Sequence, residues 1–231
     1  MNKLVFVIYG AGSDIIAPVF DHFSEANFIC LVNRSKPDRL KGVILETESD
    51  NFESDLKSAL TNVAKDRLFI YLNAAVYQKD ELFITHSRKD IEQMVRVGIT
   101  LPLVVSQIVL EEMVKRRKGR VINLSSFRAH APTKGTVVYA AIKSFGNTLF
   151  SAVGLEYGRF DITSNSIAIG FAESKLLDSL EAKKLSEFKK SVAKKKFLPE
   201  EEFLGAIEYI INSKYFNASV IDLNGGLELL K

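Results

Sequence analysis

The chain has 231 residues, of which 47% are hydrophobic and 26% are charged. This composition is ordinary for a globular protein, and the length suits one sizeable domain rather than two. With 31 basic and 28 acidic residues, the net charge of +3 is too small to indicate a nucleic-acid partner. The single cysteine, Cys30, excludes an internal disulfide framework and suits a reducing cytoplasm, which is the location that we expect.

The scattered histidines and the short apolar N-terminus argue against a metal site and a membrane partner. Three histidines and one cysteine, widely separated, form no metal-binding pattern, so we expect no metal. The apolar run at 4–9 is too short for a membrane span or a signal segment, so we expect no membrane partner.

Short apolar segments alternate with longer helical ones along the chain. The expected strands are 4–9, 28–33, 43–46, 67–74, 119–125, 163–169 and 219–223. The expected helices are 14–25, 51–64, 88–117, 137–158, 173–190 and 199–212. Most strand segments are near-continuous apolar runs, as in strands covered on both faces. The alternation predicts an α/β fold with a doubly wound, mostly parallel seven-stranded sheet and helices on both faces.

Two glycines follow the first expected strand, in the stretch VFVIYGAGSDIIAP. Gly10 allows a sharp turn from strand to helix, and Gly12 lets the backbone approach a ligand. The N-terminus of the following helix would then attract a phosphate group. Asp14 can cap this helix, but its charge competes with a phosphate. A tight turn without a ligand remains the alternative at this point.

Tyr139 and Lys143 form a second candidate site within a segment expected to be helical. A spacing of four residues puts both side chains on one helix face. A cation near a phenol lowers the pKa of the phenol, which makes a tyrosine usable as an acid or base near neutral pH. An exposed helix with an unrelated tyrosine and lysine is equally compatible with this spacing.

Ser125 and Ser126 come at the end of the apolar strand segment GRVINLS. A hydroxyl at the carboxyl end of a parallel strand faces the ligand crevice and can hydrogen-bond a substrate carbonyl. Alone, such a serine is more often a loop or cap residue. The glycine turn, Ser126 and the Tyr139–Lys143 pair nevertheless occur in the order that a single site needs, which favours one catalytic site.

Together these motifs resemble those of the short-chain dehydrogenases/reductases, and the resemblance runs essentially from end to end. Ser126 lies thirteen residues before Tyr139, as is usual for the catalytic serine of that family, and Tyr139 and Lys143 match its YxxxK motif. The other matching segments are 10–16 for the glycine-rich turn TGxxxGIG, 72–75 for NNAG, 165–170 for N-A-V-x-P-G and 222–226 for the C-terminal V-N/D-G-G.

The resemblance implies a single Rossmann-fold domain over 1–231, with a mobile substrate lid at about 171–198. It also implies hydride transfer between a nicotinamide cofactor and a carbonyl or alcohol substrate. By resemblance, Tyr139 is the acid or base, Lys143 lowers its pKa and holds the nicotinamide ribose, and Ser126 binds the substrate oxygen. The expected cofactor contacts are Gly10, Gly12, Ser13, Asp14, Ile15, Asn33, Arg34, Ser35, Asn73, Ala74, Ala75, Tyr139, Lys143 and Gly170. The expected substrate contacts are Ser126, Phe127 and Phe171.

Some positions depart from the pattern of the family. Asp14 and Ile16 replace glycines of the turn, and Ile16 is expected to push the first helix outward or re-aim it. Gly98 falls where the family has an asparagine that helps to hold a water between the lysine and solvent. A nucleotide-binding relative with weak or no turnover therefore remains an alternative.

The segment after the second expected strand favours NADP over NAD. No carboxylate occupies the strand end, and Arg34 can pair with a 2′-phosphate in a charge-assisted contact. Asn33, Ser35 and Lys36 can add to this contact. We therefore predict NADP as the cofactor.

The segments expected to select the substrate are basic. The loop 127–136 contains Arg128 and His130, and the segment 183–196 is rich in lysine. This rim indicates an anionic or carrier-bound substrate, and a 3-oxoacyl-[acyl-carrier-protein] reductase-like enzyme is the more specific alternative. A solvated helix face is the other interpretation of the lysine-rich segment. The run 115–118 adds basic surface. The resemblance implies a homodimer or homotetramer, paired through the helices at 88–117 and 137–158 and the C-terminal strand.

Overall fold

Seven parallel strands form a single sheet in the computed structural model, which describes residues 3–33, 36–172 and 182–227. The strand order is β3-β2-β1-β4-β5-β6-β7, and the six neighbouring pairs are all parallel. The strands are β1 Leu4–Tyr9, β2 Asn27–Val32, β3 Val43–Glu46, β4 Leu68–Asn73, β5 Gly119–Ser126, β6 Ile162–Ile169 and β7 Val220–Leu223. The predicted doubly wound α/β fold is confirmed.

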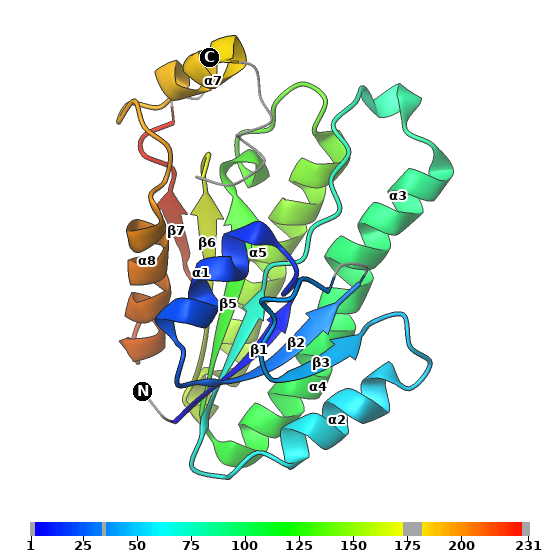
Figure 1. Ribbon diagram of the computed structural model, residues 1–231, viewed down its shortest axis with the longest axis vertical. Helices are drawn as coiled ribbons and strands as arrows, with labels where there is room; N and C mark the ends of the chain where they lie inside the picture. The colour runs from blue at the N-terminus through cyan, green and yellow to red at the C-terminus, as the bar shows by residue number, and fades with distance from the viewer. Residues whose placement is uncertain (1–2, 34–35, 173–181, 228–231) are drawn as a thin grey trace.

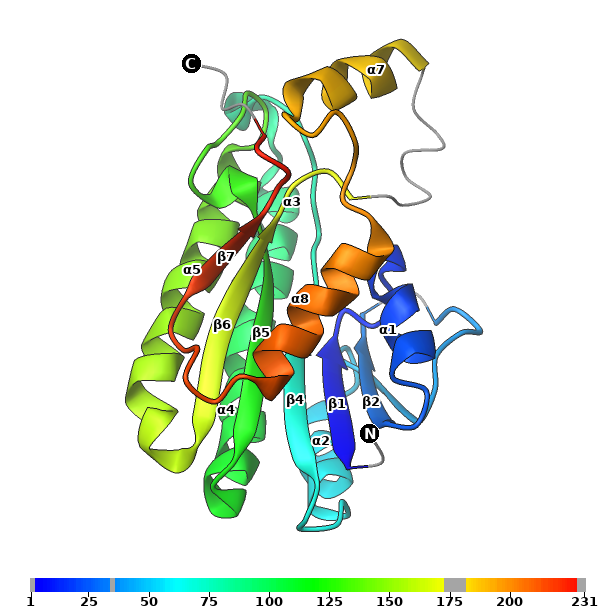
Figure 2. The same cartoon turned by 90° about the vertical axis from the view of Figure 1, so that its left-hand side faces the viewer.

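The helices cover both faces of this sheet (Figures 1 and 2). They are α1 Ala17–His22, α2 Phe52–Thr61, α3 Arg88–Val95, α4 Leu101–Arg116, α5 Val137–Tyr157, α7 Ala182–Ser191 and α8 Glu200–Asn212. Side chains of α2, α4 and α5 form one apolar core with Val5 and Val7 of β1. Those of α1 and α8 form the other core with Phe6 and Ile8, because successive strand residues point to opposite faces.

The direction of strand order reverses around β1. The chain pairs β1 first with β2 on one side and then with β4 on the other. The loops after β1 and β4 therefore diverge, which opens a crevice at their carboxyl ends. The edge strands differ from the prediction of strands covered on both faces, because Val43 of β3 and Val220 of β7 are substantially exposed.

The first helix is shorter and less regular than predicted. A 3-10 turn spans Asp14–Ile16, and the α-helix α1 ends at His22. The N-cap position of the turn belongs to Ser13, and the side chain of Asp14 does not act as a cap. Ile16 is completely buried in the core that α1 shares with α8. The isoleucine is thus accommodated where the helix begins, within a tight 3-10 turn.

The predicted helix at 88–117 is interrupted. A π-helical turn, Arg96–Thr100, joins α3 to α4. The combined stretch Arg88–Arg116 has the length and apolar composition of a membrane-spanning helix, but half of its most apolar part is buried inside the protein. Val105 and Val109 of α4 are fully buried against the sheet. Burial in the core is therefore a sufficient reason for the apolar character of this helix.

Candidate functional site

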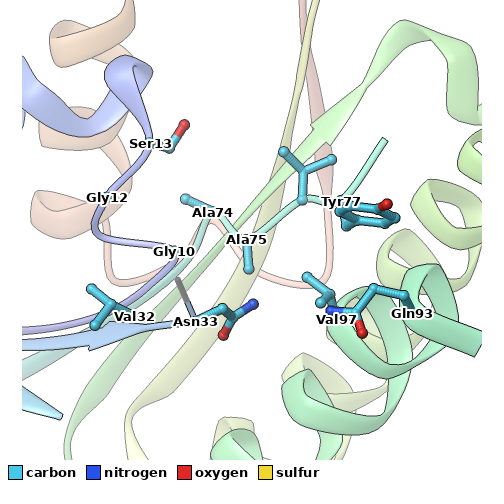
Figure 3. A pocket seen from close by; sticks show the side chains of 11 residues that line it. Gly10, Gly12, Ser13, Val32, Asn33, Ala74, Ala75, Tyr77, Gln93 and Val97 are labelled. Atoms are coloured by element: carbon cyan, nitrogen blue, oxygen red, sulfur yellow. The ribbon is translucent and has the colours of Figure 1, made fainter. Parts of the chain in front are cut away.

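A cleft opens at the carboxyl ends of β1, β2 and β4, and Figure 3 shows the residues around it. It has a volume of about 240 Å³ and is lined by Gly10, Gly12, Ser13, Val32, Asn33, Ala74, Ala75, Val76, Tyr77, Gln93 and Val97. Six of the predicted cofactor contacts therefore share this cleft: Gly10, Gly12, Ser13, Asn33, Ala74 and Ala75. Sequence reasoning missed Tyr77, Gln93 and Val97, which carry no motif.

Gly10 is required for the close approach of the turn to the loop after β4. Its φ angle is +87°, and a Cβ atom here would lie 2.5 Å from the backbone of Ala75. A side chain at this position would therefore clash with backbone that cannot move cheaply. Gly10 and the small residues of the loop, Ala74 and Ala75, keep the backbone along the cleft accessible to a ligand.

The end of β2 contributes one polar side chain with a fixed orientation. Asn33 Nδ2 donates to the hydroxyl of Tyr9 at 3.4 Å, and the Thr47 hydroxyl donates to Asn33 Oδ1. Arg34 and Ser35, on which the prediction of NADP rested, lie outside the described residues. Lys36 forms an ion pair with Glu46 of β3, so its charge is partly offset.

Arg39 connects the loop after β2 with the glycine turn. Its Nη2 donates to the carbonyl of Gly12 at 2.8 Å and lies 3.1 Å from Asp14 Oδ1. The Arg39 Nε is buried and has no hydrogen-bond partner among the described residues. The negative charge of Asp14 is therefore paired with a cation rather than left to repel a phosphate. Sequence reasoning missed Arg39, and a basic residue in the loop after the second strand was the signal that could have found it.

Asp14 and Ile15 line a neighbouring cleft rather than the one at the end of β1. This second cleft lies between the first helical turn and the start of α8, and Arg39, Ala172 and Phe203 also line it. Asp14 and Ile15 thus stay next to the glycine turn, although they face a different hollow from Gly12 and Ser13. Their predicted contacts with a cofactor remain predictions.

Ser126, Tyr139 and Lys143 come together, as predicted, at the carboxyl end of β5. The hydroxyl of Ser126 hydrogen-bonds to the phenol of Tyr139 and accepts the backbone N–H of Arg128 at 3.3 Å. Lys143 Nζ lies 5.8 Å from the centroid of the Tyr139 ring. The same Nζ donates to the carbonyl of Leu124, in β5, at 2.7 Å. The lysine is thus anchored to the strand that carries the serine.

The electrostatics of this cluster differ from the prediction that Lys143 lowers the pKa of Tyr139. Burial raises the pKa of the Tyr139 phenol, and the hydrogen bond from Ser126 and the charge of Arg128 only partly oppose this effect. Burial also lowers the pKa of Lys143 to about 8, because desolvation disfavours its ammonium form. The sequence-based prediction did not include desolvation, which has the largest effect on the pKa of both Tyr139 and Lys143.

A buried amide network joins β5, the strand that ends at Ser126, to β4 and β6. Asn73 Nδ2 donates to Asn123 Oδ1 at 2.9 Å, and Asn123 Nδ2 donates to Ser166 Oγ at 3.0 Å. Asn73, a predicted cofactor contact and the last residue of β4, therefore joins the end of this strand to β5. Asn123 was missed in the sequence, although its polar amide within the apolar run GRVINLS was a signal.

The predicted substrate contacts Phe127 and Phe171 meet, with ring centroids 5.7 Å apart. Phe171 also stacks on Phe188 of α7, at 4.7 Å between centroids. Gly170 precedes this aromatic group, and a Cβ atom there would lie 2.9 Å from the Cα of Asn224. The segment after β6 is thus packed closely against the loop after β7. Residues 173–181 of the predicted lid lie outside the described residues.

The basic run at 115–118 is far from this site, contrary to its suggested part in substrate or carrier binding. It lies between the end of α4 and the start of β5, and Ser126 stands at the other end of that strand, roughly 25 Å away at 3.3 Å per residue. Arg116 bonds to Glu112 and to the carbonyls of Val63 and Ala64. These residues therefore stabilise the opposite edge of the fold.

In the described parts of the chain, no group of three or more His, Cys, Asp or Glu residues could hold a metal ion. Cys30 is buried and donates to the carbonyl of Lys41 at 3.3 Å. Cys30 is therefore a buried core residue and not part of the candidate site.

The chain is similar to known proteins of one family. Residues 5–185 match the short chain dehydrogenase family. The 3-oxoacyl-[acyl-carrier-protein] reductase FabG of Buchnera aphidicola subsp. Baizongia pistaciae is 24% identical over 240 residues, which cover 98% of each chain. The FabG of Aquifex aeolicus is 27% identical over 164 residues, or 70% of this chain and 66% of that protein. In several such relatives the match thus spans about two thirds of the relative.

Solved structures show the same fold. A 3-oxoacyl-[acyl-carrier protein] reductase from Brucella melitensis superimposes with a TM-score of 0.83 at 17% identity, covering 98% of this chain and 91% of that one. A short-chain dehydrogenase/reductase mutant from Serratia marcescens gives a TM-score of 0.80 at 21% identity, with 98% of both chains covered. The fold and the site thus define a Rossmann-type protein with a tyrosine–lysine centre. The chain belongs to the short-chain dehydrogenase/reductase family.

Proposed function

We propose that the protein is an NADP-dependent oxidoreductase that interconverts a carbonyl and an alcohol, with Tyr139 as the acid or base. The observation that carries this proposal is the cluster of Ser126, Tyr139 and Lys143 at the carboxyl end of β5. It lies at the same edge of the sheet as the cleft beside the glycine turn. Ligands of open α/β sheets bind at this edge.

The residues around the cleft fit a dinucleotide. Gly10 and Gly12 leave the backbone of the turn uncovered, and Ala74 and Ala75 add no bulk on the facing side. The Arg39 guanidinium, whose buried Nε lacks a hydrogen-bond partner among the described residues, offers a donor to a phosphate group. Asn33 offers an amide at the end of β2.

The bound nicotinamide would supply or accept the hydride. In the reduction, Ser126 and Tyr139 would both hydrogen-bond the carbonyl oxygen of the substrate and so orient it. Tyr139 would give its proton to that oxygen, and its raised pKa keeps the phenol protonated before the transfer. Lys143 would hold the cofactor ribose while its Nζ stays anchored to the carbonyl of Leu124.

The preference for NADP is supported by Arg39 in addition to Arg34, which lies outside the described residues. Arg39 reaches from the loop after β2 to the glycine turn, where the ribose of an adenosine moiety would lie. A planar guanidinium binds a phosphate through parallel hydrogen bonds. No carboxylate lies at the end of β2 to bind the ribose hydroxyls, so NAD fits this edge less well.

The decisive experiment is a comparison of the wild type with Tyr139→Phe. We expect NADPH-dependent reduction of members of a carbonyl panel by the wild type, and a loss of about 10²- to 10⁴-fold in the variant. NADPH binding, measured by fluorescence, should persist in the variant. Binding without any turnover in the wild type would favour the alternative of a nucleotide-binding relative, and unchanged turnover in the variant would refute the role of Tyr139.

A 3-oxoacyl-[acyl-carrier-protein] reductase-like activity is the second candidate, favoured by the names of the relatives. Lys190 and Lys194, in the described part of the predicted lid, offer exposed positive charge to an acidic carrier. In this case acetoacetyl-carrier protein should be reduced much better than acetoacetyl-coenzyme A. Lys190→Gln/Lys194→Gln should weaken only the use of the carrier-bound substrate.

The proposal also includes a homodimer or homotetramer, a single domain over 1–231 and a cytoplasmic location. A shallow groove between α4 and α5 is lined by Leu103, Leu110, Leu149 and Val153, and Leu155 beside it is largely exposed. Apolar surface of this kind, on the two helices through which the family pairs, supports a homodimer or homotetramer. Light scattering of the wild type and of Leu155→Glu tests this interface.

A further inference from the structure

A second cation lies beside the proposed catalytic tyrosine. Arg128 belongs to the 3-10 turn Phe127–Ala129 that follows β5. Its guanidinium carbon lies 5.9 Å from the centroid of the Tyr139 ring, and its backbone N–H is bonded to Ser126 Oγ. Both ends of Arg128 therefore face residues that would hold the reacting oxygen of a substrate.

The hydrogen-bonding capacity of this guanidinium is only partly used. Its Nη1 lies 3.3 Å from Asp80 Oδ2, in the loop after β4, which is long for a charge-assisted bond. The Nε is buried and has no hydrogen-bond partner among the described residues. The Arg128 side chain is only 18% exposed. A charge with so little access to water needs a well-placed partner, and Asp80 satisfies it incompletely.

Asp80 is suited to leave this pair. Its side chain is 47% exposed, so it can return to water at little cost. Its other oxygen, Oδ1, already accepts a bond from Gln78 at 2.6 Å. The neighbouring cation of the same loop, Lys79, is held by Asp90 at 2.8 Å and by Glu81 at 3.1 Å. Arg128 is therefore better placed than Lys79 to accept a new anion.

Resting on the proposed oxidoreductase function, we propose that Arg128 binds an anionic group of the substrate and that Asp80 is the counter-ion it exchanges. The substrate class is then a small carbonyl or alcohol compound with a carboxylate or phosphate close to the reacting carbon. Both groups match the planar donor set of a guanidinium. Because Ser126 and Tyr139 hold the reacting oxygen, an anion on Arg128 fixes the substrate at a second point and orients its carbonyl.

Two matched pairs of compounds separate charge from shape. Acetoacetate and ethyl acetoacetate differ in a carboxylate, while dihydroxyacetone phosphate and dihydroxyacetone differ in a phosphate. Binding is measured by calorimetry with and without saturating NADP⁺, which cannot reduce a ketone. We expect at least one anion to bind tighter than its neutral partner, and Arg128→Gln to weaken that anion by about 10- to 100-fold. If only acetoacetate loses affinity in Arg128→Gln, the bound group is a carboxylate; if only dihydroxyacetone phosphate does, it is a phosphate.

Two further variants keep the test specific. Arg88→Gln removes the same charge from a side chain that is 92% exposed on α3, and it should leave anion binding unchanged. Asp80→Asn removes the competing carboxylate, and it should tighten anion binding several-fold. In steady-state assays with NADPH, Arg128→Gln should lower the ratio of kcat/KM for the anion to kcat/KM for its neutral partner, which loss of a merely structural contact would not change.

Equal affinity of the wild type and Arg128→Gln for both anions overturns this proposal, as does a preference for neutral probes. These results leave the oxidoreductase function intact if NADPH is still consumed with neutral ketones. Failure of the oxidoreductase function itself would appear separately, because the protein would then not bind NADP⁺ or would reduce none of the ketones. The test of anion binding does not depend on this result, since it is also made without cofactor.

Discussion

A Cβ atom on Gly98 would lie 2.4 Å from Cγ2 of Ile142. Gly98 lies in the π-helical turn before α4, and Ile142 immediately precedes Lys143 on α5. The isoleucine thus fills the place into which a side chain at position 98 would point. At this position, where the family pattern implies an asparagine, the chain has an apolar contact between two helices.

Gly98→Ala should therefore destabilise the protein, although alanine is favoured over glycine in helices by about 1 kcal/mol. We expect a net loss of about 1 to 3 kcal/mol in the free energy of unfolding, because Cγ2 of a β-branched side chain cannot swing away freely. Urea unfolding measures this change.

In the Ile142→Ala background, Gly98→Ala should cost much less free energy of unfolding than it costs in the wild type, because the clashing side chain is gone. A double-mutant cycle quantifies this difference. Additive losses would show that the two positions do not compete for space. The variant Gly98→Asn/Ile142→Ala should turn over faster than Ile142→Ala, because the amide of the new asparagine can support a water between Lys143 and solvent. Equal rates would mean that proton transfer through this position does not limit turnover.

The pair formed by Arg39 and Asp14 leads to a prediction about cofactor choice. Arg39→Ala should weaken NADPH binding by about 10- to 100-fold, which corresponds to about 1.5 to 3 kcal/mol for a hydrogen-bonded charge, with little effect on NADH. Asp14→Asn should have the opposite effect on NADPH, because Arg39 no longer shares its charge with a carboxylate. Fluorescence titration of both cofactors measures these affinities.

A suitable control for this experiment is Arg159→Ala, an exposed residue before β6 at the opposite edge of the sheet. It should change neither affinity. If Arg39→Ala weakens NADPH and NADH equally, the arginine supports the turn itself rather than a 2′-phosphate.

The elements of the fold were predictable because their patterns are local. The bounds of β1 and β3 were predicted without error, and each end of the other strands was placed within one residue. The π-helical turn at Arg96–Thr100 and the early end of α1 at His22 were not predicted, because both depend on how a helix packs against its neighbours. Apolar periodicity contains no information about such contacts.

The same distinction applies to the site. Ser126, Tyr139 and Lys143 were found because their spacing is a local motif. Arg39 and Asp80 were not found, since each reaches its partner across a loop: Arg39 is 27 residues from Gly12, and Asp80 is 48 from Arg128. The pKa of Tyr139 was predicted in the wrong direction because burial cannot be read from a spacing of four residues.

The amide network that joins β4, β5 and β6 should contribute measurably to stability. Asn123→Ala leaves the amide of Asn73 and the hydroxyl of Ser166 without their buried partner. We expect a loss of about 2 to 3 kcal/mol in the free energy of unfolding. Asn62→Ala, an exposed change at the end of α2, is the control and should cost much less. A loss no larger than that of the control would mean that water replaces the missing amide.

Lys143 should make the stability of the cofactor-free protein depend on pH. Its pKa is lowered to about 8 in the folded protein from an ordinary value of 10.5, because its ammonium group is buried. At pH 7 both the folded and the unfolded chain hold the proton, and the folded state carries the full desolvation cost. Between these two pKa values only the unfolded chain holds it, so a rise in pH favours folding.

The stability of the wild type relative to Lys143→Met should therefore increase by about 2 kcal/mol between pH 7 and pH 9.5. Comparing the pH slopes, rather than absolute stabilities, removes the constant effect of losing the bond to Leu124. Urea unfolding across this range measures the slopes, and Lys57→Met, at an exposed position of α2, should show no such trend. A flat difference for Lys143→Met would mean that the ammonium group is not desolvated in the folded protein.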